Sequence, residues 1–386
     1  MRNGRGRKAP CIGMVASGGG WMKKAPLHPA VEALCEGMRK IGRVDLHVLL
    51  AENHARESRE KRNESSWTRV APGPGPRIWG GNFLARSAGL KRELNIIRPH
   101  LVHGQGTEKE AAWAAVFSGF PSVITLHGLM GEVARLPCNR FVIQYRIAAF
   151  LEKVAVQKAD GVIAVSPHAE KMLARMHPRV CRIPNAVRGE FYTIPPPTPR
   201  PVSRVLFSGH LTPAKRPEWF LEAVHGLWEE GLKFEATLMG MGDPHHPYFQ
   251  KIETQARRTV RGRRIRWLVN QPGVGAEIRR ADILFHPSML ENMSIALAEA
   301  MAAGRCVVAA DIPGNVSLLG REGGLLFPSG QQGAAVQALR AALSQPARRE
   351  EAGARARKMA QMFRPEIIAG QTVDFYGKIL GKKIPR

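Results

Sequence analysis

Short hydrophobic runs rich in β-branched residues alternate along most of the chain with longer stretches in which apolar residues recur at helical spacing. This alternation is typical of β-α-β units and therefore predicts parallel sheets covered by helices. The first series of expected strands comprises Cys11–Ala16, Asp45–Leu50, Leu101–His103, Ser122–Leu126, Gly161–Val165 and Val180–Ile183. These strands are enough for one complete doubly wound domain.

A proline-rich stretch, residues 195–201, ends this series. Proline can continue neither a helix nor a central strand, so we expect a stiff linker between a first domain, residues 1–194, and a second, residues 202–364. Residues 365–386 carry apolar side chains at helical spacing and should form a helix that packs back on the first domain. The strands expected in the second domain are Arg204–Ser208, Phe234–Met239, Ile265–Leu268, Ile283–Phe285, Cys306–Ala309 and Gly324–Phe327.

The composition fits this α/β fold class: 44% of the 386 residues are hydrophobic and 23% are charged. No apolar run approaches the roughly 20 residues that cross a bilayer, and the basic start leads into glycines rather than a signal core. We therefore expect a cytoplasmic protein. The cysteines form no Cys-x-x-Cys pair, so the sequence predicts neither a disulfide framework nor a zinc site.

The formal net charge of +25 is the first unusual property of the chain. An excess of basic residues favours acidic partners, such as nucleic acid, an anionic membrane surface or phosphorylated substrates. A generally basic surface without a dedicated partner fits the charge as well. No nucleic-acid-binding motif is recognisable, so we expect no nucleic-acid partner.

Ligands of open parallel sheets bind beyond the carboxyl ends of the strands, and two such domains facing each other would form a cleft there. Gly18, Gly19 and Gly20 follow the first strand, where backbone amides can approach a phosphate or a sugar. His127 follows the strand Ser122–Leu126 and can hydrogen-bond a sugar hydroxyl or a phosphate. A flexible turn and a structural histidine are the alternative interpretations.

The second domain opens with Gly209, His210 and Lys215 between a strand and a helix, and Gly240 ends the next strand. Helix amides and a lysine suit a diphosphate. Further on, Glu291 and Glu299 stand eight residues apart. If a helix begins near Ser294, Glu299 lies on its second turn, where it can accept hydrogen bonds from a ribose diol, while Glu291 stays in the preceding loop.

Residues 291–299 resemble the Glu-x7-Glu motif of the retaining glycosyltransferases of family 4, the group 1 glycosyltransferases, which have the GT-B fold. Segments in the same order extend the resemblance to about residues 11–380: Arg98–His103, Thr125–Gly128, Ala159–Ser166, Ile183–Val187, Cys306–Asn315 and Gly323–Pro328. The resemblance implies two Rossmann-like domains that face each other across a cleft.

By this resemblance, Glu291 contacts the transferred sugar, Glu299 the nucleotide ribose, Lys215 the diphosphate, and His127 the donor sugar or its phosphate. Glu291, His127 and Lys215 are thus the expected catalytic residues. The other expected donor-binding residues are Gly18, Gly19, Gly20, Gly209, His210, Gly240, Asn292, Met293, Ser294 and Ile295.

Three departures from the family pattern bear on this site. His210 stands where the family has an arginine, five residues before the lysine, which weakens diphosphate neutralisation or makes it pH-dependent. Asn292-Met293-Ser294 replaces Gly-Phe-Gly after Glu291, which alters which sugar fits. Ala186 and Arg188 replace the usual glycine and aspartate of an Asn-Gly-Val-Asp turn.

The chain has no Asp-x-Asp pair, so we expect no metal and no cofactor, with a nucleotide diphosphate sugar as co-substrate. The family mechanism retains anomeric configuration, and catalysis is mainly electrostatic positioning. The expected function is transfer of a hexose-like sugar to a glycan or lipid-linked acceptor in cell-surface polysaccharide, lipopolysaccharide or glycolipid synthesis. A GT-B nucleotide-sugar epimerase and a noncatalytic GT-B binding protein are the alternatives.

The acceptor is expected on the first domain, which has a basic and aromatic region that suits a phosphorylated glycan core or the anionic inner face of a membrane. A second basic run, between Arg257 and Arg266, is expected to be a solvated helix end. The residues of the first region are Arg56, Arg59, Lys61, Arg62, Trp67, Arg69, Arg77 and Trp79.

Overall fold

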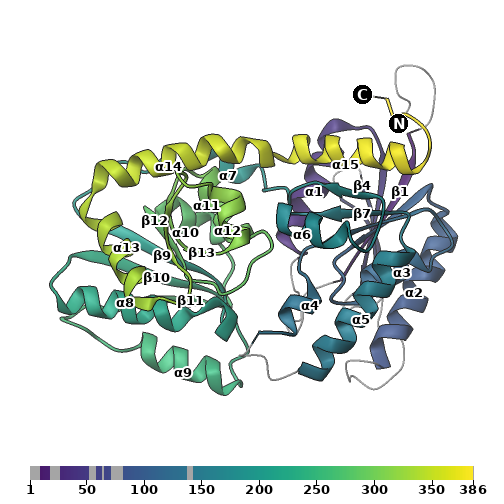
Figure 1. Ribbon diagram of the computed structural model, residues 1–386. Helices are drawn as coiled ribbons and strands as arrows, with labels where there is room; N and C mark the ends of the chain where they lie inside the picture. The colour runs from purple at the N-terminus through teal and green to yellow at the C-terminus, as the bar shows by residue number, and fades with distance from the viewer. Residues whose placement is uncertain are drawn as a thin grey trace. The chain divides into compact units, whose positions relative to one another are not determined.

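The computed structural model describes residues 9–17, 27–51, 58–62, 65–70, 81–136 and 142–385 (Figure 1). These residues form two compact units, one of residues up to Arg188 together with Phe363 onward, the other of Gly189–Met362. The proline-rich stretch lies within the second unit, six residues after the change of unit. No helix of the described residues is long and apolar enough to cross a membrane.

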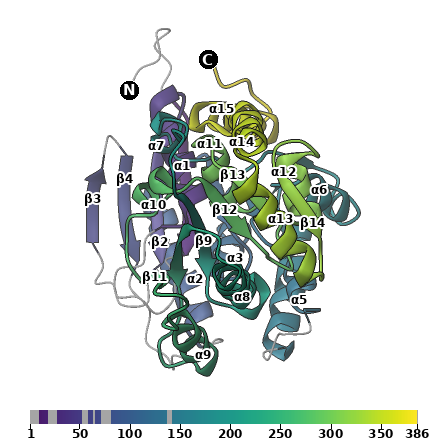
Figure 2. The same ribbon diagram turned by 90° about the vertical axis from the view of Figure 1, so that its left-hand side faces the viewer.

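The first unit is built on an eight-stranded sheet in the order β3-β4-β2-β1-β5-β6-β7-β8. All neighbours that pair are parallel except β3 and β4, which the sequence did not predict and which pair antiparallel at one edge (Figure 2). The strands are β1 Cys11–Ser17, β2 Asp45–Ala51, β3 Ser58–Arg62, β4 Ser65–Val70, β5 Leu101–Gln105, β6 Ser122–Leu126, β7 Gly161–Ala164 and β8 Val180–Arg182.

Helices cover both faces of this sheet because successive strand residues point to opposite sides. In β1, Met14 packs into the core on the face of α1 and α15, whereas Val15 packs into the core on the face of α2, α3 and α5. The helices are α1 Pro29–Ile41, α2 Gly81–Ile97, α3 Glu110–Val116, α4 Met130–Val133, α5 Val142–Lys158, α6 Pro167–Leu173 and α15 Pro365–Ile379.

The C-terminal helix α15 packs on the first unit, as predicted. Ile368, Val373 and Tyr376 are buried in the core that α1 helps to form. The two helices approach very closely, since a Cβ atom on Gly37 would lie 2.0 Å from the carbonyl oxygen of Pro365.

The second unit contains a six-stranded parallel sheet in the order β11-β10-β9-β12-β13-β14. From β9 the chain adds β10 and β11 toward one edge of the sheet, and from β12 it adds β13 and β14 toward the other edge. The strand order therefore reverses between β9 and β12, which are neighbours in the sheet. The strands are β9 Ser203–His210, β10 Phe234–Met241, β11 Arg266–Val269, β12 Ile283–His286, β13 Cys306–Asp311 and β14 Leu325–Pro328. The helices are α7 Glu190–Thr193, η1 Pro213–Lys215, α8 Pro217–Glu229, α9 Pro247–Ala256, α10 Val274–Arg280, α11 Ile295–Ala302, α12 Pro313–Leu319, α13 Gln332–Ser344 and α14 Pro346–Ala360, and the short turn η2 Gln361–Phe363 follows.

A row of aromatic rings in the core holds β9 and β12 together. Phe220 of α8 lies between Phe207 and Phe285, with ring centroids 5.7 and 6.1 Å away, and Phe285 stacks on Phe327 at 6.0 Å. All four side chains are at most 1% exposed. This packing fixes the positions from which the loops after β9 and β12 begin.

Candidate active site

The carboxyl ends of β9 and β12 flank the point where strand order reverses in the second unit. Ligands of doubly wound sheets bind at such a point, because the loops after the two strands run in opposite directions and leave a crevice. β9 leads through His210 to the turn η1, and β12 leads through His286 to the loop that holds Glu291. The predicted residues Lys215 and Glu291 therefore come from the two strands that flank this point.

Lys215, Glu291 and His286 form one hydrogen-bonded cluster. Lys215 Nζ donates to Glu291 Oε1 over 2.5 Å, and His286 Nε2 lies 2.9 Å from the same oxygen. Burial alone would raise the pKa of the Glu291 carboxyl, but the charge of Lys215 and the hydrogen bond from His286 outweigh it and hold the pKa well below its ordinary value. Glu291 is thus an ionised carboxylate within the protein, and its side chain is only 8% exposed.

His286 is a member of this cluster to which the sequence analysis assigned no role. Its Nε2–H donates to Glu291, and its buried Nδ1 has no hydrogen-bond partner among the described residues. The signal that could have identified it was the one used for His127, a histidine at the carboxyl end of a strand.

Close backbone contacts hold the loops of the cluster in place. Met289 N–H donates to Ala214 C=O over 2.8 Å, which ties the loop before Glu291 to η1. A Cβ atom on Gly314 would lie 2.1 Å from the carbonyl oxygen of Glu291, so only glycine fits there. A Cβ atom on Gly240 would lie 1.7 Å from the carbonyl oxygen of Gly209, so packing accounts for the glycine at this predicted donor-binding position.

His210 lies close to the same cluster, at the end of β9. Burial and the neighbouring charge of Lys215 lower the pKa of His210, although Glu291 acts in the opposite direction. A ring with a lowered pKa is neutral at pH 7, so His210 does not replace the charge of the arginine that the family carries at this position.

The helix α11 begins where the sequence predicted. Ser294 is its N-cap, with Oγ accepting a hydrogen bond from Leu297 N–H, and Glu299 follows on the second turn with 3% of its surface exposed. Asn292, Met293 and Ser294 lead into the helix and Ile295 is its first residue. The free amides of a helix N-terminus favour an anion beside this segment.

His127 lies in the first unit, directly after β6. Its Nδ1 is 3.0 Å from Asn185 Oδ1 and its Nε2 is 3.0 Å from Gln105 Oε1. Its ring also packs on that of His28, with centroids 4.6 Å apart. Burial lowers the pKa of His127 to about 4, so the ring is neutral and donates through one nitrogen.

A buried polar chain continues from Gln105 to the C-terminal helix. Gln105 Nε2 lies 3.2 Å from His103 Nε2. His103 in turn lies 2.6 Å from Tyr376 Oη and 2.7 Å from Thr125 Oγ1. Burial lowers the pKa of His103 to about 3. The sequence did not identify Gln105, His103 or Tyr376 as members of this buried chain, because segments far apart in the sequence bring them together.

The remaining predicted residues of the first domain are described only in part. Gly18, Gly19, Gly20, Arg56, Arg77 and Trp79 lie outside the described residues. Arg59 donates to the buried Glu93 over 2.8 Å, and Arg69 lies 3.5 Å from Glu60. Two arginines of the predicted acceptor region therefore already have acidic partners.

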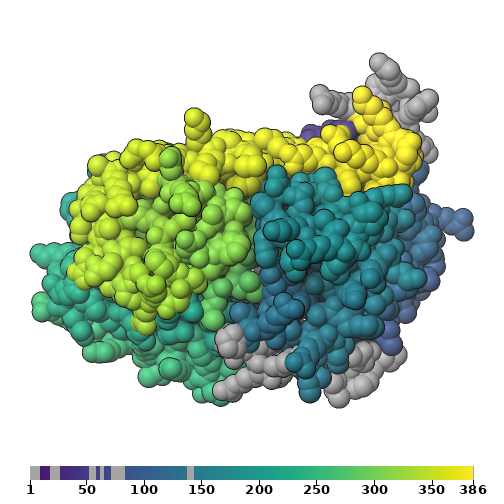
Figure 3. All heavy atoms as spheres, viewed as in Figure 1, coloured from purple at the N-terminus to yellow at the C-terminus, as the bar shows by residue number. Residues whose placement is uncertain are grey.

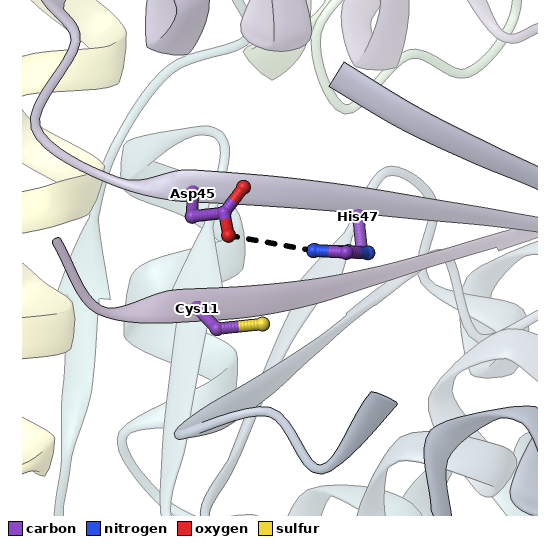
Figure 4. Close-up of side chains that lie close together, drawn as sticks. All are labelled: Cys11, Asp45 and His47. Carbon is purple, nitrogen blue, oxygen red and sulfur yellow. Dashed lines mark ion pairs between the residues drawn. The ribbon is translucent and has the colours of Figure 1, made fainter. Parts of the chain in front are cut away.

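One group of side chains in the described part of the chain is close enough to share a metal ion (Figure 4). Cys11, Asp45 and His47 place their ligand atoms within 4.8 Å of one another, and His47 Nε2 is 3.5 Å from Asp45 Oδ2. Cys11 and Asp45 are the first residues of β1 and β2. The group therefore lies at the opposite end of the sheet from His127 and is separate from the candidate site.

Comparison with known families identifies the chain. A model described as "Glycosyl transferases group 1" matches residues 197–359, and one described as "Glycosyltransferase Family 4" matches residues 30–190. The chain belongs to the group 1 glycosyltransferases. Both matches agree with the resemblance that the Glu-x7-Glu segment carried.

Curated relatives include several bacterial transferases. Phosphatidyl-myo-inositol mannosyltransferase of Mycobacterium leprae is 28% identical over 283 residues, 71% of this chain and 72% of the relative. Alpha-maltose-1-phosphate synthase of Mycolicibacterium smegmatis is 24% identical over 341 residues, 79% of this chain and 86% of the relative.

Solved structures show the same GT-B architecture. Sucrose-phosphate synthase from Thermosynechococcus elongatus matches with a TM-score of 0.80 at 19% identity, covering 97% of this chain and 100% of that one. HepE of Anabaena, in complex with UDP-glucose, matches with a TM-score of 0.72 at 16% identity over 96% and 100% of the two chains. At these identities the likeness concerns the fold.

Proposed function

We propose that this glycosyltransferase moves a sugar from a nucleotide diphosphate sugar to a phosphorylated or lipid-linked glycan acceptor, with retention of anomeric configuration and without a metal. The cluster of Lys215, Glu291 and His286 at the strand-order reversal is the observation that carries the proposal. A half-buried lysine paired with a buried carboxylate at the usual ligand position of this fold suits a donor that has both a diphosphate and hydroxyl groups.

Each donor group has a residue of matching chemistry. Lys215 neutralises the diphosphate, together with the amides of Asn292–Ile295, and Glu291 accepts hydrogen bonds from hydroxyls of the sugar. Glu299 accepts from the ribose diol, which suits its place on the second turn of α11. In the first unit, His127 hydrogen-bonds the sugar or its phosphate when the donor takes the place of Gln105 Oε1 or Asn185 Oδ1 at one ring nitrogen. The ring is neutral, so it orients the donor and does not balance its charge.

The chemical step needs no nucleophilic side chain. The bond between the anomeric carbon and the diphosphate oxygen breaks, and the charge on the leaving diphosphate is stabilised by Lys215 and helix amides. The acceptor hydroxyl attacks from the same face, and its proton passes to the leaving phosphate oxygen. Attack on that face retains the configuration.

The acceptor class rests on the relatives and the charge of the chain. The names of curated relatives include phosphatidyl-myo-inositol, maltose 1-phosphate and, for a relative from Jonesia denitrificans, D-inositol 3-phosphate. A net charge of +25 favours an acceptor with a phosphate group or an anionic membrane surface. We propose a cytoplasmic enzyme of cell-surface glycan or glycolipid synthesis that binds its acceptor on the first unit.

The first experiment is a melting-temperature series with UDP, GDP, ADP and pyrophosphate at matched ionic strength. A ligand at 100 times its dissociation constant stabilises by about 2.7 kcal/mol. We expect one nucleoside diphosphate to raise the melting temperature above the pyrophosphate control, and Glu299→Ala to abolish the difference. Equal shifts with every anion would support a noncatalytic binding protein instead.

The second experiment follows the products with the identified donor and a phosphorylated acceptor. NMR of the product gives the anomeric configuration, and addition of EDTA tests the need for a metal. Release of an epimerised sugar without transfer would show an epimerase. Inversion, or loss of activity with EDTA, would contradict the proposed mechanism.

A further inference from the structure

A cavity of about 480 Å³ lies in the second unit, away from the candidate active site. Residues 196–199, residues of α14, and Asp282 and Cys306 are among those that line it. Asp282 directly precedes β12 and Cys306 begins β13, so the cavity lies where these strands start. The candidate active site lies at their opposite ends. The segment around residue 350, yellow-green in Figure 3, is at the surface of this unit.

Cations outnumber carboxylates around this cavity. Arg349, Arg357 and Lys358 of α14 line it, against Asp282 and Glu350. Asp282 is already engaged, since it accepts a hydrogen bond from Arg204 N–H over 2.8 Å and lies 3.4 Å from Arg200 Nε. The charge of the lining cations is therefore not balanced by the acidic residues of the cavity.

The guanidinium groups here donate to neutral oxygens. Arg357 donates to the carbonyl oxygens of Ile194 and Tyr192 over 2.6 and 2.9 Å. Arg349, which is 7% exposed, donates to Ser203 Oγ over 3.0 Å. These bonds orient the groups without neutralising them, and an uncompensated charge in a poorly solvated place is costly.

Arg305, between the lining residues Gly304 and Cys306, adds to this excess charge. Its side chain is 1% exposed, and its Nε is buried without a hydrogen-bond partner among the described residues. Burial lowers the pKa of Arg305 to about 10, and the charges of Arg200 and Arg357 act in the same direction against that of Asp282. An anion in the neighbouring cavity would relieve this crowding.

We propose that this cavity binds a compact phosphomonoester, at a site separate from that of the donor sugar. Guanidinium groups and a lysine match the oxygens of a phosphate, and the volume falls in the range of small-molecule sites. Anchoring of residues 192–195 explains the hydrogen bonds of Arg357 and the one that Arg305 donates to the carbonyl oxygen of Pro195. It does not explain Lys358, whose side chain is exposed and makes no ion pair or hydrogen bond in the described part of the chain.

The test uses the full chain with Lys215→Ala and Glu291→Gln together, which removes the candidate diphosphate cation along with its partner charge. Glucose 6-phosphate and inorganic phosphate are titrated by calorimetry at about 0.15 M salt, where exposed charges are largely screened. We expect saturable binding of one glucose 6-phosphate. Lys358→Glu should weaken it about tenfold or more, the effect of losing one charged hydrogen bond and adding a repulsion.

Lys251→Glu is the matched control, because Lys251 is an exposed lysine of α9 in the same unit. It makes the same charge change away from the cavity and should leave binding within about twofold. Vesicles of phosphatidylcholine with and without phosphatidic acid test a lipid source of the phosphomonoester. Binding to phosphatidic acid vesicles that is lost in Lys358→Glu would assign a lipid headgroup.

Two results would overturn the inference. Equal weakening by Lys358→Glu and Lys251→Glu would show nonspecific attraction to a basic protein. No binding of either the soluble probes or the vesicles would show that the cavity is not an anion site. Neither result depends on sugar transfer, so the inference and the proposed function can fail separately.

Discussion

The ion pair of Lys215 and Glu291 is the residue-level feature most open to a direct test. Lys215→Ala leaves the Glu291 carboxylate with His286 alone, and we expect a loss of about 1–3 kcal/mol of unfolding free energy. The double variant, with Glu291→Gln added to Lys215→Ala, lacks the unbalanced carboxylate charge and should recover part of that loss. Urea unfolding of the two single variants and the double variant measures the coupling, and additive losses would show that the pair does not interact.

On the proposed function, Glu291→Gln is also expected to lower kcat at least about 100-fold, because the amide cannot carry the charge that would orient the sugar and Lys215. Glu322→Gln, at an exposed carboxylate whose side chain is 76% accessible, is the control and should keep full activity. Unchanged turnover in Glu291→Gln would remove this residue from the catalytic assignment.

The pH dependence of the first unit follows from three buried groups with opposite signs. The pKa values of His103 and His127 are lowered to about 3 and 4, so protonation favours the unfolded chain and stability is lost as pH falls below about 6.5. Glu152 accepts hydrogen bonds from Thr107 and from Met130 N–H, and burial raises its pKa to about 7. Its protonated form stabilises the native state as pH falls from about 7 toward 4.3, which offsets part of the histidine effect.

Glu152→Gln removes the opposing titration but keeps an oxygen for Met130 N–H. We therefore expect its unfolding free energy to fall by about 2 kcal/mol more than that of the natural chain between pH 7 and pH 5. Urea unfolding at both pH values, followed by far-UV circular dichroism, measures the difference. Parallel pH profiles of the two proteins would contradict the raised pKa of Glu152.

At the scale of elements, the contact between α1 and α15 depends on one glycine. Gly37→Ala places a Cβ 2.0 Å from the Pro365 carbonyl oxygen, so the helices must separate, at a cost of about 1–3 kcal/mol despite the better helix propensity of alanine. Gly370→Ala in α15 has nothing within 4 Å of the new Cβ and should stabilise by about 0.5–1 kcal/mol. Thermal unfolding of both variants checks the contrast, and the same sign in both would refute it.

The interior strands could be predicted from sequence because they are buried on both faces. All 12 expected strands are present, with ends within two residues of the predicted ones. β3 was missed because it lies at an edge of its sheet, where a strand such as Ser58–Arg62 needs no hydrophobic run. β4 was missed because Ser65–Val70 mixes buried with half-buried and polar side chains and contains no hydrophobic run either.

The candidate site could be predicted only where sequence neighbours carry the signal. The spacing of Glu291 and Glu299 and the start of α11 were visible in one segment, and the start of α11 was confirmed. The contact of Tyr376 with His103 joins residues 273 positions apart, and the role of Gly240 depends on the backbone of a neighbouring strand. No local pattern reports such contacts.

For the whole molecule, the two units differ in how the chain builds them. The second unit is one continuous stretch, Gly189–Met362, with its own aromatic core, whereas the first unit needs the segment from Phe363 onward. α15 supplies Ile368, Val373 and Tyr376 to the first core, and each is at most 2% exposed. Removal of this helix would expose the apolar face of α1 and the histidine chain beneath it.

We therefore expect residues 189–362 to fold alone, with a cooperative thermal transition, because their core closes without help from the rest of the chain. Residues 1–188 should lack such a transition until a peptide of residues 363–386 is added, since burial of three large side chains contributes about 5 kcal/mol or more. Circular dichroism melts of both fragments, with and without the peptide, test both expectations.

The peptide with Tyr376→Ala is the control and should restore folding poorly, because it loses both the ring and the hydrogen bond to His103. A cooperative melt of residues 1–188 alone would show that the first unit folds without α15. It would also show that the surroundings of His127 form without the C-terminal helix.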